Sequence, residues 1–102
     1  MATPEVLVKK QIRRILNEEE VYYAMPIGTG YGNSGVPDFL VCCAGYFFGI
    51  EAKAGNNKPT TLQEDHLYRI RKSGGRTLVV NETNINELKE LIQWMKKNLS
   101  AV

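Results

Sequence analysis

The sequence predicts an α/β fold with a mixed central sheet flanked by helices, its elements following the order α-β-β-β-α-β-α. Two patterns predict this fold: three segments repeat apolar residues at helical spacing, and short β-branched or aromatic runs lie between them. The length and composition agree with this fold class. A chain of 102 residues, 43% hydrophobic and 24% charged, suits a single globular domain over residues 1–102. This composition excludes a disordered chain, a collagen and a coiled coil.

The first helix is expected to begin at Pro4, with Thr3 as its N-cap, and to fade between residues 17 and 20. Its stripe at helical spacing consists of Glu5, Val8, Ile12 and Ile15/Leu16. Residues 21–25 predict a short strand, and residues 27–37 a glycine-rich loop. The letters G-x-G-x-x-G occur within that loop, but they lead into a strand and not a helix, which argues against a dinucleotide site.

A β-hairpin is predicted next, with arms over 39–43 and 46–54 and a two-residue turn at Ala44-Gly45. Both arms are apolar on both faces, which favours central strands covered on each side. Cys42 and Cys43 are neighbours in one strand and point to opposite faces, so no bridge between them is expected. We interpret both as buried thiols in a reducing compartment.

The remaining elements are a helix, a strand and a final helix. Thr61 to Glu64 matches a capping box, and the helix that it opens is expected to run to Ser73, before Gly74-Gly75. Residues 77–80 predict a strand. The last helix should begin near Asn84, with an apolar stripe of Ile85, Leu88, Leu91/Ile92, Met95 and Leu99.

The hairpin brings charged residues together at its open end. If Ala44-Gly45 is the turn, Asp38 lies opposite Glu51, and directly opposed residues share a face. Lys53, two residues after Glu51, points the same way. Two opposed carboxylates destabilise a sheet unless a cation compensates, and Mg²⁺ prefers such hard oxygen ligands. The alternative is a structural role, in which the Lys53 ammonium only neutralises the Glu51 carboxylate.

These residues resemble a known nuclease signature. Pro37-Asp38 followed by Glu51-Ala52-Lys53 is similar to the PD-(D/E)XK motif, and the element order resembles the restriction-endonuclease-like core of that superfamily. Within it, the small size, the glycine-rich run before Pro37 and the Glu-Ala-Lys triplet look most like a stand-alone VRR-NUC domain. Such domains resemble archaeal Holliday-junction resolvases. The resemblance covers about residues 4–80.

The resemblance implies a metal-dependent active site. Asp38, Glu51 and the backbone carbonyl of Ala52 would bind Mg²⁺ or Mn²⁺, and Lys53 would orient the attacking water and stabilise charge on the phosphate. The family also implies a first-helix glutamate, for which Glu5 is the candidate, although the helix dipole alone favours an acid there. Gln63 would be the glutamine that assists the site.

Cations near the second helix are expected to contact nucleic-acid phosphates. The residues proposed for this contact are Lys58, Arg69, Lys72 and Arg76. A basic ridge on the first helix, formed by Lys9, Lys10, Arg13 and Arg14, is either a second such contact or a solvated face. His66 lacks partners at ligand spacing, so we expect a surface or half-buried side chain and not a metal ligand. Related nucleases of the RecB type add a tyrosine four residues beyond the glutamine; here that position is Leu67 and Tyr68 is one position off, which puts this extra ligand in doubt.

The function implied is a Mg²⁺-dependent endonuclease acting on branched DNA or four-way junctions, working as a homodimer because symmetric cutting needs two sites. A non-catalytic DNA-binding module on the same scaffold is the alternative, and an unrelated α/β domain with a chance motif is a third. The net charge of +2 neither requires nor excludes a nucleic-acid partner. The absence of a signal peptide or membrane span predicts a cytoplasmic protein, and the family is associated with viruses and mobile elements.

Overall fold

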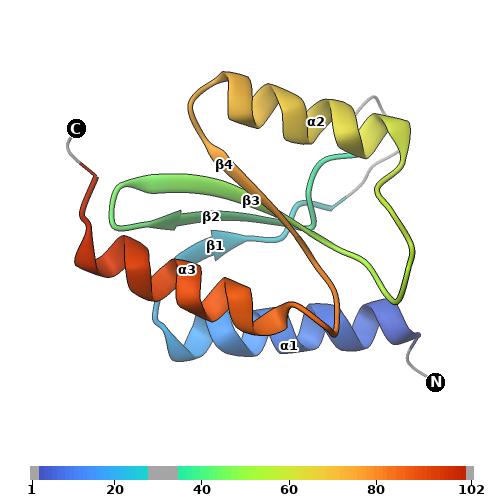
Figure 1. Cartoon of the computed structure of the whole chain (residues 1–102), viewed down its shortest axis with the longest axis horizontal. Helices are drawn as coiled ribbons and strands as arrows, with labels where there is room; N and C mark the ends of the chain where they lie inside the picture. Colours follow the sequence, from blue (N-terminus) through green and yellow to red (C-terminus); the bar gives the residue numbers. More distant parts are fainter. Residues whose placement is uncertain (1–2, 28–34, 101–102) are drawn as a thin grey trace.

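The computed structural model describes residues 3–27 and 35–100, and its elements follow the predicted order (Figure 1). The elements are α1 (Pro4–Glu18), β1 (Tyr22–Ala24), β2 (Phe39–Cys43), β3 (Tyr46–Ala52), α2 (Thr61–Lys72), β4 (Arg76–Val80) and α3 (Ile85–Lys97). The sheet order is β1-β2-β3-β4; β2 is antiparallel to both β1 and β3, and β4 is parallel to β3. The predicted mixed sheet is therefore confirmed.

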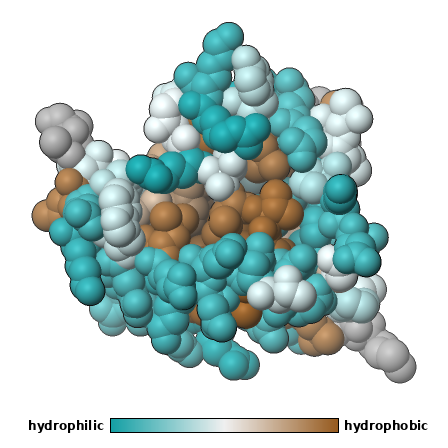
Figure 2. Space-filling view, in the orientation of Figure 1, coloured by the Kyte–Doolittle hydropathy of each residue, from teal (hydrophilic) through white to brown (hydrophobic). Residues whose placement is uncertain are grey.

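Helices cover the two faces of the sheet unequally. Figure 1 shows α2 on one side and α1 with α3 on the other. The core lies on the α1/α3 side, where the two helices bury Val8, Ile12, Leu16, Leu88, Ile92 and Met95 against residues of β2, β3 and β4. Apolar surface also remains along the edge strand β4 between α2 and α3 (Figure 2), where Leu78 and Val79 are only half-buried.

The tight turn between β2 and β3 fixes the register of the hairpin. Ala44 and Gly45 both have positive φ angles, 53° and 85°, as a two-residue turn of primed type requires. The paired residues then run from Cys43↔Tyr46 to Phe39↔Ile50, which is the predicted register. A slip by one residue would have turned the residue before β2 to the other face.

The helix termini agree with the sequence at α1 and differ by one residue at α2. The Thr3 hydroxyl accepts a hydrogen bond from the Val6 N–H, so Thr3 caps α1 as predicted. The N-cap of α2 is Thr60, not Thr61, and Gln63 closes the reciprocal capping box instead of Glu64. The box forms here because the Gln63 side chain reaches back to the Thr60 N–H at 2.8 Å.

One part of the hairpin is less covered than its apolar sequence predicted. Cys42 and Phe47 are exposed, while Cys43 is buried, and both cysteines are free. The prediction that both thiols are buried was wrong, because α2 covers only part of its face of the sheet and α1 with α3 cover the other face. Burial raises the pKa of the Cys43 thiol, which keeps it protonated.

Across residues 3–27 and 35–100, none of the helices has the length and apolar character needed to span a bilayer. The glycine-rich run over 28–34, including most of the G-x-G-x-x-G letters, lies outside the described residues.

Candidate active site

The open end of the hairpin brings Asp38 and Glu51 together. The last paired residues are Phe39 and Ile50, so continuing the register by one residue sets Asp38 opposite Glu51. The Asp38 carboxylate accepts a hydrogen bond from the Ala52 N–H at 2.8 Å. Because this N–H points toward β2, the Ala52 carbonyl faces the same side of the strand. The Asp38 and Glu51 carboxyl groups of the predicted metal site therefore lie close together, and the Ala52 carbonyl is on the side of β3 that faces β2.

The residues around Asp38 hold it at this position by packing. Pro37 is buried, and the chain leaves the sheet at this point. A Cβ on Gly49 would lie 2.9 Å from the Ile70 side chain and 3.1 Å from that of Pro37. A side chain at position 49 would therefore press on Pro37, which folds over β3 beneath α2. The Ala52 N–H then donates its hydrogen bond to the Asp38 side chain, and not to a backbone carbonyl of a neighbouring strand.

Glu51 is a buried acid with an incomplete set of partners. Its side chain is 2% exposed, and its Oε1 is a buried atom that has no hydrogen-bond partner among the described residues. Burial, reinforced by the neighbouring Asp38 carboxylate, raises the pKa of Glu51 to about 8, while the Lys53 ammonium opposes this rise. A buried carboxyl with a free oxygen beside another carboxylate is an arrangement that a cation would relieve.

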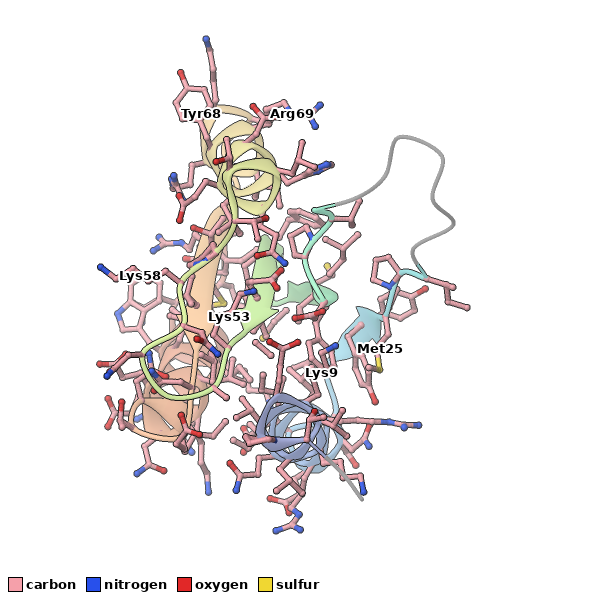
Figure 3. The ribbon with its side chains drawn as sticks, turned by 90° about the vertical axis from the view of Figure 1, so that its right-hand side faces the viewer. Lys9, Met25, Lys53, Lys58, Tyr68 and Arg69 are labelled. Carbon is pink, nitrogen blue, oxygen red and sulfur yellow. The ribbon has the colours of Figure 1, made fainter. Side chains whose placement is uncertain are left out.

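Lys53 lies beside these acids and is held by the backbone. It is only 8% exposed, and its N–H donates to the Val80 carbonyl at 2.9 Å, which continues the β3–β4 pairing beyond the strand. The following loop is also fixed, because the Gly55 N–H donates to Glu82 at 2.6 Å and its carbonyl accepts from Asn81. Figure 3 shows Lys53 at the end of β3, beside the loop that follows the strand.

A lysine from α1 also enters this region. The Lys9 Nζ lies 3.3 Å from Asp38 Oδ1 and 3.8 Å from Glu5 Oε2. Glu5 is half-buried at the edge of the group, and its charge adds slightly to the rise in the pKa of Glu51. The predicted basic ridge of α1 is therefore divided: Lys9 turns toward Asp38, and its neighbour Lys10 is exposed.

The donor set fits one hard divalent cation held by few protein ligands. Among the described residues there is no group of three or more His, Cys, Asp or Glu side chains placed to hold a metal ion. Asp38 and Glu51 supply two carboxylates and Ala52 a carbonyl, and the buried Glu51 oxygen is available. Mg²⁺ is commonly bound by one or two carboxylates with water completing its shell, so the site fits this ion.

Two solved structures resemble this chain. One, described as a VRR-NUC domain, is 27% identical over 90% of this chain and 97% of its own, with a TM-score of 0.70. Another, described as a VRR-NUC domain protein, is 19% identical, covers 98% of this chain and 93% of its own, and has a TM-score of 0.69. The chain has the fold of these VRR-NUC domains. Comparisons with protein-family models and with curated proteins find no match.

Gln63 has a structural role at the start of α2. Its Oε1 accepts the Thr60 N–H, and its own N–H donates to the Thr60 hydroxyl at 3.2 Å. The side chain is half-buried at the start of α2. Its predicted assistance to the active site stays a prediction, since the observed contacts of its side-chain oxygen are those of a helix cap.

The cations predicted to contact DNA are spread over the molecule. Lys58 lies on the loop that follows the site residues and points outward (Figure 3). Arg69, on the outer side of α2, forms an ion pair with Asp65 at 3.2 Å. Lys72 lies at the end of α2, and Arg76 begins β4 opposite Phe48, three residues before Glu51 in the register. Only Lys58 follows the site closely along the chain.

Other polar side chains of α2 lie outside the site. Tyr68 is exposed on the outer side of the helix, away from Lys53 (Figure 3), and its ring contacts Lys72. His66 is half-buried, as expected, and its ring contacts Arg69. The site residue that sequence reasoning missed is Lys9. The available signal was its position four residues after Glu5, which places both on one face of the helix.

Proposed function

We propose that this chain is a VRR-NUC domain and a metal-dependent endonuclease that hydrolyses phosphodiester bonds in DNA, with branched DNA or four-way junctions as its substrate. The observation that carries the proposal is the buried Glu51 carboxyl, which has an unpartnered oxygen and lies beside Asp38 and Lys53. Perturbed acids grouped with a lysine occur preferentially at functional sites. A purely structural sheet would be more stable with apolar residues at these positions.

Each residue has a distinct role in the proposed reaction. Asp38, Glu51 and the Ala52 carbonyl would hold Mg²⁺ or Mn²⁺. When bound, such an ion polarises a phosphoryl oxygen and lowers the pKa of a coordinated water. Lys53 would orient the attacking water and stabilise negative charge that develops on the phosphate, since its ammonium is already desolvated beside the carboxylates. The expected products carry a 5′-phosphate and a 3′-hydroxyl.

The proposal includes a homodimer. One chain supplies one set of Asp38, Glu51 and Lys53, whereas symmetric cutting of a four-way junction needs two sets. Lys58 is the cation best placed to contact a phosphate near the site, because it is exposed on the loop directly after the site residues. Arg69, Lys72 and Arg76 would contact DNA farther from the scissile bond.

The test is cleavage of a labelled four-way junction beside a linear duplex of the same sequence, with Mg²⁺ and with Mn²⁺. The matched variant is Asp38→Asn, because an amide oxygen can still accept the Ala52 N–H while the charge is lost. Lys53→Met keeps both carboxylates and should lose cutting while still binding Mn²⁺. Metal-dependent cutting of the junction that both variants lack would support the proposal. Equal cutting of the two DNAs would remove the junction preference.

A non-catalytic DNA-binding module is the second candidate. The ion pair between Lys9 and Asp38 favours it, because this pair already neutralises one of the two carboxylates. The same assay distinguishes the two functions. Wild-type protein that binds the junction in a gel-shift experiment, but cuts neither DNA with either metal, would establish the module and refute the endonuclease.

A further inference from the structure

The ammonium of Lys9 occupies a position beside the proposed metal ligands. It lies 3.3 Å from Asp38 Oδ1, while Asp38 Oδ2 accepts the Ala52 N–H. Both oxygens of this carboxylate are therefore engaged without a metal. In the same region the Oε1 of Glu51 has no hydrogen-bond partner among the residues described. The positive charge of Lys9 is thus placed on Asp38 and Glu5 and not on Glu51, the most buried acid.

The position of Lys9 is set by contacts with two different elements. Glu5 lies one helical turn earlier on α1, at the i,i+4 spacing that favours an ion pair. Asp38 belongs to the segment that enters β2, so the contact joins α1 to the hairpin. The Lys9 side chain is 31% exposed, and Figure 3 shows it directed from α1 toward the hairpin. It is thus held in place but can also move to solvent.

We infer that Lys9 is a resident counter-cation of this site, which a divalent metal ion must displace from Asp38 in order to bind. An ammonium at 3.3 Å uses the charge of the same carboxylate that a metal ion would need, and two cations sharing it repel each other strongly in a partly buried setting. Lys9 would then stabilise the metal-free protein and weaken metal binding. This inference rests on the proposed function, since it concerns regulation of the same site.

The test measures Mn²⁺ alone, by calorimetric titration and by melting temperature in EDTA and in excess Mn²⁺. The variants are Lys9→Met, which removes the ammonium and keeps chain length, and Lys9→Arg, which keeps the charge. Lys10→Met is the matched control, because Lys10 is the adjacent exposed lysine on the same helix. Circular dichroism in EDTA verifies that each variant is folded.

Lys9→Met is expected to bind Mn²⁺ about tenfold more tightly than wild type, the ratio that loss of one nearby unit charge readily supplies. Its melting temperature should fall in EDTA, and the rise on adding Mn²⁺ should become larger than in wild type. Lys9→Arg and Lys10→Met should behave as wild type does. A lysine with only a structural role would lower the melting temperature in both conditions and leave Mn²⁺ affinity unchanged.

The possible results separate this inference from the proposed function. If wild type binds Mn²⁺ and Lys9→Met binds it equally or more weakly, the counter-cation role is wrong and the metal site stands. If Lys9→Met binds while wild type does not, the counter-cation role is supported in its strongest form. If neither protein binds Mn²⁺ although Lys9→Met is folded, both the inference and the metal-dependent function are refuted.

Discussion

Replacing Glu51 by glutamine should stabilise the metal-free protein at alkaline pH. Glutamine has nearly the shape of glutamic acid and carries no charge, so the substitution isolates the electrostatic cost of this buried group. The pKa of Glu51 is raised to about 8 because its side chain is buried and Asp38 lies beside it. In the folded protein, Glu51 therefore keeps its proton at pH values where an unfolded chain has lost it.

The sign of the pH dependence follows from this difference in bound protons. Between pH 4.5, the ordinary value for a glutamic acid, and about 8, the folded state binds more protons than the unfolded state, so the free energy of unfolding falls as pH rises. This free energy falls by at most ~1.4 kcal/mol for each pH unit. The decrease between pH 5 and pH 8 is therefore at most on the order of 4 kcal/mol.

Glutamine removes this loss but also removes the attraction between the ionised Glu51 and Lys53. We therefore expect Glu51→Gln to raise the free energy of unfolding by about 2 kcal/mol at pH 8 and to change it little at pH 5. For a chain of this size that corresponds to roughly 10 °C in melting temperature.

The assay is urea unfolding in EDTA at pH 5, 6.5 and 8, followed by circular dichroism. The control is Glu18→Gln, the same change at an exposed carboxylate of α1, which should have no pH-dependent effect. In excess Mn²⁺, wild type should be more stable than Glu51→Gln, because only wild type keeps both carboxylates for the ion. A variant that is less stable than wild type at pH 8, or a difference that is equal at pH 5 and pH 8, would refute the assignment of Glu51 as a strained acid.

Three further substitutions test the framework around the site by urea unfolding. Gly49→Ala should cost ~1–3 kcal/mol and reduce Mn²⁺-linked stabilisation, because its Cβ would displace Pro37 beside Asp38; unchanged Mn²⁺ stabilisation would show that this contact does not position the acid. Thr60→Ala should cost about 1 kcal/mol through loss of the α2 cap, whereas the same change at Thr61 should cost much less. Ala44→Asn should add ~0.5–1 kcal/mol, because asparagine tolerates the positive φ of this turn better than alanine; a loss of stability would contradict the turn assignment.

The sequence predicts the juxtaposition of Asp38 and Glu51 well because local rules determine the hairpin register. Ala44-Gly45 allows a turn that needs two positive φ angles, the turn fixes the register, and the register sets Asp38 opposite Glu51. Each of these steps depends on residues close in sequence, so spacing alone was sufficient.

Residues positioned by long-range packing were harder to predict. The helical pattern placed Lys9 in a basic ridge, but only the docking of α1 beside the hairpin shows that it reaches Asp38. The exposure of Cys42 depends on how far α2 extends across the sheet, which no local pattern gives. In contrast, the one-residue difference between the predicted and observed N-cap of α2 has a local cause. Thr60 and Thr61 each offer a capping box, and the reciprocal hydrogen bonds between Gln63 and Thr60 select Thr60.

The charges at the open end of the hairpin do not balance. Three carboxylates, those of Glu5, Asp38 and Glu51, share two ammonium groups, Lys9 and Lys53, and the acid left with a free oxygen is the most buried one. A sheet that served only stability would place apolar side chains there, because opposed acids weaken strand pairing. Local rules of folding are commonly broken where function requires it. In the proposed function, a divalent cation would supply the positive charge that is missing at this end of the hairpin, and displacing Lys9 would free that lysine to meet the phosphate of the substrate.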